Sequence, residues 1–202
     1  MSGPSLRRFA RPSTRPRCDL CAAPLDEQHG HLVALDQRAL RCVCRACYLL
    51  FTPDGAGGAR LKAVPTRYLH DPAHPVSVAD WEALGIPVGT AFFFTNSDLD
   101  RVVACYPSPA GATESLLDLT DLAKWHHPLL AAAVPDVEAV FVHDGDAFLV
   151  PIDRCYALVG ELRRRWQGID GGAAARQVIS DFTADLRNRT HVSGRPGQHW
   201  VW

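Results

Sequence analysis

Two C-x-x-C pairs near the N-terminus are the feature that most constrains this chain. Cys18 and Cys21 form the first pair, and Cys44 and Cys47 form the second. Two such pairs about twenty residues apart are typical of a short segment that closes a tetrahedral thiolate site around zinc. The segment 18–51 is too short to bury a sufficient core of its own, whereas a structural zinc contributes roughly 10 to 16 kcal/mol at neutral pH. We therefore expect zinc to decide whether this segment folds.

The residues between the two pairs predict a hairpin. Alternating runs from His31 to Asp36 and from Ala39 to Cys44 flank the dipeptide Gln37-Arg38. A short helix that begins near Arg45 would then present Cys47 one turn after Cys44. This order of knuckle, hairpin and helix indicates a zinc ribbon or treble clef.

The ligand set has an ambiguity at the second pair. Cys42 lies two residues before Cys44, and on a strand such residues point to the same face. We take the four cysteines of the C-x-x-C pairs as the metal ligands and keep three alternates: Cys42, His29 and His31. Zinc is the expected metal, although four thiolates also suit iron or an iron–sulfur cluster, which would make the protein an electron-transfer protein.

Composition narrows the function classes. The chain has 202 residues, of which 47% are hydrophobic and 21% charged, with a formal net charge of −1. This near-neutral total argues against a dedicated nucleic-acid binder. However, residues 1–17 contain five arginines and no acid, so we expect a disordered basic arm and retain a nucleic-acid-binding zinc ribbon as an alternative. No signal-peptide core and no run of about 18 apolar residues is present, so we expect a cytoplasmic protein without a membrane span.

The rest of the chain divides by its turn residues. The zinc module is expected at 18–52, and a linker rich in glycine at 53–75. A second domain is expected at 76–190, followed by a tail at 191–202. Its first helix should begin after Ser77, an N-cap with Asp80 at the capping-box position.

The second domain has an α+β pattern. Four strands are predicted, at 91–94, 102–106, 137–142 and 147–152, the last two as a hairpin around Asp144-Gly145. Helices are predicted at 120–130, 153–166 and 173–189. Tight hairpins exclude parallel βαβ units, so we expect a mainly antiparallel four-stranded sheet that helices cover on one face.

Signals for catalysis in this domain are weak. The segment 108–115 has hydroxyls and a glycine that could cradle an anion, but a plain turn explains it. The neighbours His126 and His127 diverge by about 100° on a helix, and the group His143, Asp144 and Asp146 already has a turn explanation. Cys105 and Cys155 are expected to be buried small hydrophobes. We name no catalytic residue and favour a non-catalytic protein.

The C-terminal tail ends in Trp200 and Trp202. Tryptophan is the residue that an interface most often buries, so we predict that these two bind a partner protein. The alternative is that the tail folds back over its own domain.

Several motifs together carry a resemblance to a known family. They are CDLCAAPL from Cys18, HGHL from His29, CVCRAC from Cys42, GIPVG from Gly85, YPSPAGATES from Tyr106 and VPID from Val150. Over residues 18–167 the chain resembles an uncharacterised bacterial family that is associated with gene clusters for nickel–iron uptake hydrogenases. This resemblance implies a role in assembling or accompanying a metalloenzyme, with a hydrogenase subunit or maturation factor as the partner, and it implies no catalytic residues.

Overall fold

The computed structural model describes residues 15–53, 55–58, 60–114, 127–168 and 171–193. The chain divides into two compact units between Ala63 and Val64. Each unit has its own hydrophobic cluster. The expected linker 53–75 therefore contains the point of division, and it also contains two short strands, one in each unit.

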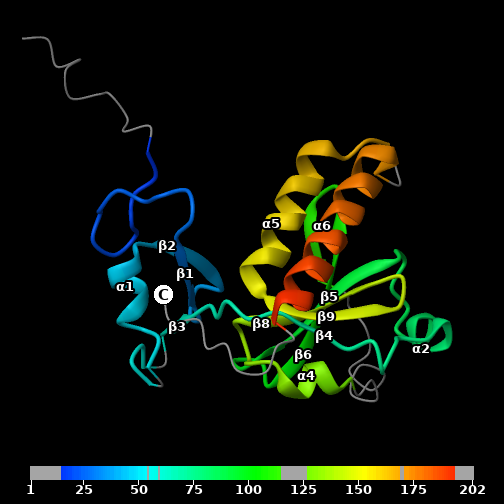
Figure 1. Cartoon of the computed structure of the whole chain (residues 1–202), viewed down its shortest axis with the longest axis horizontal. Coiled ribbons are helices and arrows are strands. Elements are labelled where there is room, and N and C mark those ends of the chain that lie inside the picture. Colours follow the sequence, from blue (N-terminus) through cyan, green and yellow to red (C-terminus); the bar gives the residue numbers. More distant parts are fainter. Residues whose placement is uncertain (1–14, 54, 59, 115–126, 169–170, 194–202) are drawn as a thin grey trace, which may run out of the picture. The chain divides into compact units, whose positions relative to one another are not determined.

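The first unit is built on the predicted hairpin (Figure 1). Strands β1 (Gly30–Ala34) and β2 (Ala39–Val43) pair antiparallel, which confirms the hairpin. The turn between them places Arg38 at a φ of 49°. Strand β3 (Leu61–Ala63), which the sequence did not predict, adds to the other edge of β1. Helix α1 (Arg45–Leu49) follows β2 after one residue, as expected.

The second unit contains an antiparallel sheet. Within the described residues it has six strands in the order β4-β9-β8-β5-β6-β7. Their bounds are β4 (Leu69–His70), β5 (Thr90–Asn96), β6 (Arg101–Ser108), β7 (Gly111–Glu114), β8 (Glu138–His143) and β9 (Asp146–Pro151).

The prediction of four strands was wrong, because the sheet gains one strand at each edge. The four expected strands form its centre, β9-β8-β5-β6. At the edges, β4 pairs with β9 and β7 pairs with β6. Edge strands can be short and need no continuous apolar run, because they pair on one side only. Their sequences therefore resemble loops.

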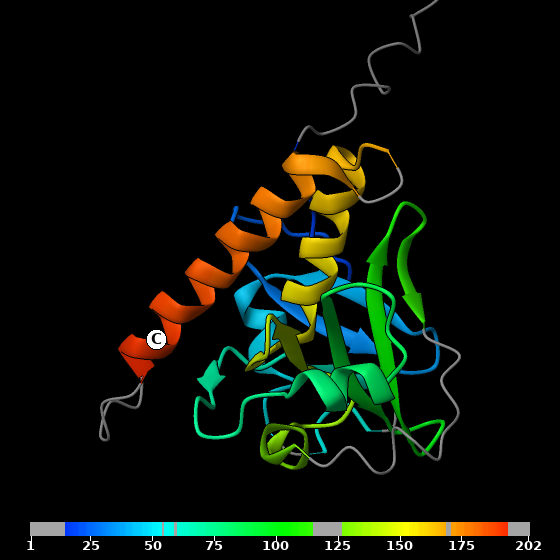
Figure 2. The same ribbon diagram turned by 90° about the vertical axis from the view of Figure 1, so that its right-hand side faces the viewer.

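Helices cover both faces of this sheet, not one as we expected. Helices α5 (Ile152–Arg165) and α6 (Gly172–Ser193) lie side by side on one face (Figures 1 and 2). Helices α2 (Val78–Ala83) and α4 (Pro128–Ala132) lie on the other face. The neighbours Phe92 and Phe93 point to opposite faces, so Phe92 packs against Tyr156 of α5 and Phe93 against Trp81 of α2. A strand buried on both faces is continuously apolar, as residues 91–94 of β5 are.

Local signals set the helix ends. Ser77 caps α2 in the predicted capping box, where its side chain accepts a hydrogen bond from the backbone N–H of Asp80. Of the predicted helix 120–130, residues 120–126 lie outside the described residues, and α4 begins within its last part, at Pro128.

No helix within the described part of the chain combines the length and hydrophobicity needed to cross a membrane.

Candidate metal centre

The first cysteine pair lies on a tight knuckle that is tied to the hairpin. Within the knuckle, the N–H of Ala22 donates to the carbonyl of Cys18 over 2.8 Å, and Ala22 has a φ of 59°. Asp19 bonds Cys42 of β2 twice, because its N–H donates to the Cys42 carbonyl and its carboxylate accepts from the Cys42 N–H. These bonds hold the knuckle against the start of the second cysteine pair.

Helix α1 positions the second pair. Cys44 is its N-cap residue, with extended backbone angles (φ −68°, ψ 161°). The N–H of Tyr48 donates to the Cys44 carbonyl and closes the first helical turn. Cys47 lies in that turn, so its side chain is on the same side as that of Cys44. The helix therefore brings both thiols of the pair to the knuckle.

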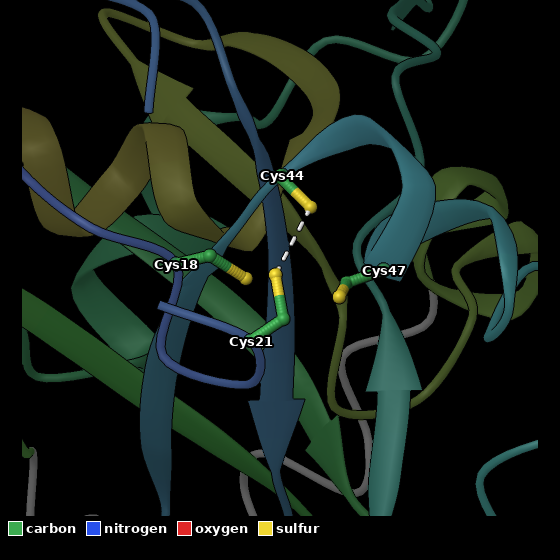
Figure 3. A group of neighbouring side chains, drawn as sticks. All are labelled: Cys18, Cys21, Cys44 and Cys47. Atoms are coloured by element: carbon green, nitrogen blue, oxygen red, sulfur yellow. Dashed lines mark hydrogen bonds between the residues drawn. The ribbon is translucent and has the colours of Figure 1, made fainter. Parts of the chain in front are cut away.

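The four sulfur atoms meet at one point (Figure 3). The Sγ atoms of Cys18, Cys21, Cys44 and Cys47 all lie within 4.8 Å of one another. Those of Cys21 and Cys44 are 3.7 Å apart. Two thiolates bound to one zinc at about 2.3 Å in tetrahedral geometry lie about 3.8 Å apart. The cluster is therefore already close to the size that a tetrahedral metal ion requires.

The environment of the cluster prepares one thiol to ionise first. Burial raises the pKa of Cys18, but the backbone N–H groups of Cys44, Cys21 and Leu20 donate to its sulfur and bring the pKa down to about 6. The hydrogen bond with Cys21, together with burial, raises the pKa of Cys47 to about 12. Four clustered thiols cannot all ionise beside one another without a cation. A bound metal ion supplies that charge.

The three alternate ligands form a separate group. His29, His31 and Cys42 offer ligand atoms that lie within 4.8 Å of one another, and none of them belongs to the four-cysteine cluster. The sequence argument placed Cys42 and Cys44 on one face because it extended the strand through both. In the structure β2 ends at Val43, so the alternation does not reach Cys44.

The weaker candidates of the second unit have structural explanations. Ser108 pairs with Gly111 in the hairpin that joins β6 to β7, and its hydroxyl accepts from the N–H of Ala110. His127 caps α4, where its Nδ1 accepts from the N–H of Leu129. Its neighbour His126 lies outside the described residues. Cys105 and Cys155 are both buried, and burial raises the pKa of Cys155 well above that of an ordinary thiol.

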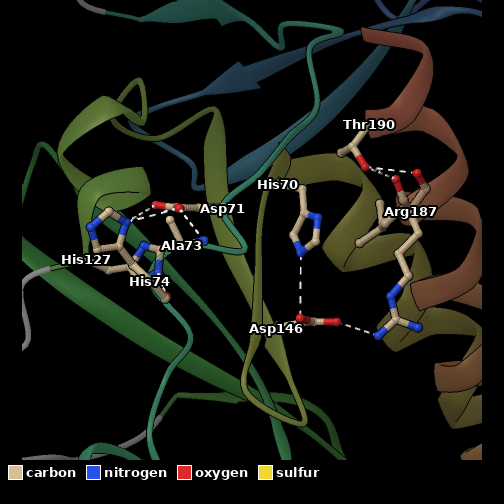
Figure 4. Close-up of polar contacts among 9 residues, drawn as sticks. His70, Asp71, Ala73, His74, His127, Asp146, Arg187 and Thr190 are labelled. Carbon is tan, nitrogen blue, oxygen red and sulfur yellow. Dashed lines mark hydrogen bonds and ion pairs between the residues drawn. The ribbon is translucent and has the colours of Figure 1, made fainter. Parts of the chain in front are cut away.

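Asp146 of the β8–β9 hairpin does not group with His143 and Asp144 as metal ligands among the described residues. It forms ion pairs with Arg187 of α6 and with His70 of β4, the latter over 3.6 Å (Figure 4). Burial opposes ionisation of Asp146, but its hydrogen bond with Arg187 keeps its pKa below the usual value. His143 instead contacts Asp144 and Thr90. The ion pair of Asp146 with Arg187 joins the β8–β9 hairpin to α6.

Sequence reasoning missed an ion pair with a fully buried acid in the second unit. Glu138 at the start of β8 is 0% exposed. Its carboxylate accepts from Nε and Nη2 of Arg67, each over 2.6 Å, and from the N–H of Val134. An acid at the start of an apolar strand was a signal for this pair, but its partner lies 71 positions away. The pair has the geometry of a structural clamp.

The proposed partner-binding residues Trp200 and Trp202 lie outside the described residues, as do residues 1–14 of the basic arm.

Comparison with known proteins places the chain in a family. A family model described as "Family of unknown function (DUF5947)" matches residues 17–190, which include both cysteine pairs and almost all of the second unit. No curated protein and no solved structure matches the chain.

Proposed function

We propose that this chain, which belongs to the Family of unknown function (DUF5947), is a non-catalytic zinc-binding accessory protein that docks a metalloenzyme or its assembly machinery. The observation that carries the proposal is the convergence of four cysteine sulfurs. Zinc in this cluster would join the knuckle, the hairpin and α1. That order of elements supports a treble-clef arrangement, in which Cys18, Cys21, Cys44 and Cys47 are the ligands.

The metal would be structural. All four positions of a tetrahedral ion would be filled by protein, which is the pattern of structural rather than catalytic zinc. The first unit has a small core, with Leu25, Leu32 and Val43 as its fully apolar buried members beside Cys18 and Cys47. Metal binding therefore supplies folding free energy that this core lacks.

Two observations support a protein partner. The resemblance to proteins of hydrogenase gene clusters favours a hydrogenase subunit or maturation factor. In addition, α1 ends at Leu49 and is capped by Leu50, and these two residues are 50% and 67% exposed. Exposed leucines beside a rigid metal site suit a docking surface, to which we add Trp200 and Trp202. We place this role in the cytoplasm, where thiols stay reduced.

Partner capture from a hydrogenase-producing host tests the docking role. We expect the full chain to retain hydrogenase subunits or maturation proteins in a pull-down followed by mass spectrometry. Leu50→Ser and deletion of residues 195–202 should each weaken capture without lowering the melting temperature. Leu99→Ser is the matched control, because Leu99 is 41% exposed on the other unit. Capture of these proteins at background level would contradict the proposal that the partner is a hydrogenase subunit or maturation factor. Nucleic acid in the eluate would favour the nucleic-acid-binding alternative.

A further inference from the structure

A second set of metal-ligating side chains lies on the first unit, outside the four-cysteine cluster. His31 and Cys42 are directly paired across β1 and β2. Directly paired residues of antiparallel strands point to the same face. His29 lies two residues before His31, and the rings of the two histidines are 4.8 Å apart. One potential ligand atom from each of the three side chains lies within 4.8 Å of the other two.

The pleat of the hairpin separates this set from the structural cluster. Leu32 and Val43 alternate with His31 and Cys42 along the two strands, so they point to the opposite face. Both are fully buried in the core that contains Cys18 and Cys47. His31 and Cys42 therefore point to the face of the hairpin opposite Leu32 and Val43, where Cys42 is partly buried at the border of that core.

The ring of His29 is oriented as a metal ligand. Its Nδ1 lies 3.0 Å from the carbonyl oxygen of Asp26. A carbonyl can only accept, so Nδ1 must carry the proton and Nε2 must carry the lone pair. Nε2 is buried and has no hydrogen-bond partner among the described residues. Histidines that bind metals hold their other ring nitrogen in this way, and a metal ion would satisfy the buried lone pair.

We propose that Nε2 of His29, an imidazole nitrogen of His31 and Sγ of Cys42 form a second metal site. Two imidazoles and one thiolate suit a borderline divalent ion, such as Zn²⁺ or Co²⁺. Three protein ligands leave a fourth position open, in contrast to the closed four-cysteine site. This position takes water or a donor atom from another molecule. The second site therefore holds an exchangeable ion, whereas the first holds a structural one.

Cobalt binding to the zinc-loaded protein tests the second site. We expect one equivalent of Co²⁺ to bind and to give a thiolate-to-cobalt absorption band. The variants His29→Ala and His31→Ala should each weaken Co²⁺ binding by at least about 100-fold, and Cys42→Ser should abolish the band. The matched control is His74→Ala, which removes an exposed imidazole from the second unit and should leave Co²⁺ binding unchanged.

Elemental analysis of the same samples separates this proposal from the structural site. The His29→Ala and His31→Ala variants should keep one zinc per chain, which shows that the first unit remains folded. No Co²⁺ binding, or Co²⁺ binding that both histidine variants retain, would overturn the second site. A fall in zinc content below one equivalent per chain in step with the absorption band would also overturn it, because cobalt would then occupy the four cysteines.

Discussion

Cys18 shows how backbone groups prepare a residue for metal binding. The thiol is buried, 3% exposed, yet three backbone N–H groups lower its pKa to about 6. These donors come from the knuckle and from Cys44, so the two cysteine pairs cooperate before any metal binds. Cys47, with a pKa of about 12, remains a thiol at neutral pH. The site therefore binds metal with release of protons.

The pKa of Cys18 predicts how zinc affinity changes with pH. Above pH 6 Cys18 is already a thiolate and releases no proton on binding, whereas Cys47 must release one throughout this range. Below pH 6 Cys18 must also release a proton, so each further unit of acidification should cost about one additional factor of ten in affinity. Competition titrations between pH 5 and pH 8 measure this slope. A slope that stays constant through pH 6 would contradict the assigned order of ionisation.

The ion pair of Arg67 with the buried Glu138 gives a stability prediction. Arg67→Ala leaves the carboxylate of Glu138 buried with only the N–H of Val134 and should destabilise the second unit by about 3 kcal/mol. Arg101→Ala is the matched control, because its partner Glu114 is 36% exposed whereas Glu138 is fully buried, so its ion pair should contribute less than about 1 kcal/mol. Urea unfolding monitored by tryptophan fluorescence compares the two. Equal losses in the free energy of unfolding from the two variants would show that the Arg67–Glu138 ion pair contributes no more than an exposed one.

Single site residues could be predicted where their spacing along the chain alone determines whether they come together. The C-x-x-C spacing selected the four cysteines that the structure gathers. It could not separate Cys42 from Cys44, because that depends on the residue at which the strand ends. Glu138 was missed for a different reason. Its partner Arg67 lies in a segment that we expected to be a linker, and the sequence carries no local sign of so distant a contact.

At the scale of elements, the fit between β1 and α1 positions the second cysteine pair. A Cβ atom on Gly30 would lie 2.6 Å from Cδ2 and 2.8 Å from Cβ of Tyr48. Neither atom can move without moving the helix or changing its side-chain rotamer. Gly30 therefore allows α1, which carries Cys47, to lie close to the hairpin.

Gly30→Ala should displace α1 and cost about 1–3 kcal/mol, which we expect to appear as faster release of zinc to a chromophoric chelator. Gly160→Ala is the control, because a Cβ atom there meets no atom within 4 Å. In the interior of α5 it should stabilise the second unit by up to about 1 kcal/mol and leave zinc release unchanged. An unchanged rate of zinc release from Gly30→Ala would contradict the proposed close packing of β1 and α1.

Helices and strands could be predicted where the residues that specify them are neighbours in one segment. The hairpin of the first unit, the central strands and the capping box of α2 each follow from neighbouring residues. Strands β3, β4 and β7 were missed because a short edge strand is defined by its partner rather than by its own sequence. The second covered face was missed because we did not infer from the continuous apolar runs of β5, β8 and β9 that both faces of these strands are buried.

At the scale of the whole molecule, the division between Ala63 and Val64 predicts separate responses to metal loss. All five tryptophans lie after position 64, so their fluorescence reports the second unit alone. Chelation of zinc, or Cys47→Ser, should make the first unit sensitive to protease while the tryptophan unfolding midpoint stays unchanged. Cys155→Ala removes a thiol outside the site and should not expose the first unit. A joint loss of both units would mean that they fold as one.

The metal content of anaerobically purified protein tests the central claim most directly. Elemental analysis and a visible spectrum should show at least one zinc per chain and no iron, and Cys21→Ser should lose one zinc equivalent relative to the wild type. Four thiolates around zinc absorb no visible light, whereas iron or an iron–sulfur cluster gives colour. Protein without zinc, or protein with iron and a visible absorption band, would contradict the account.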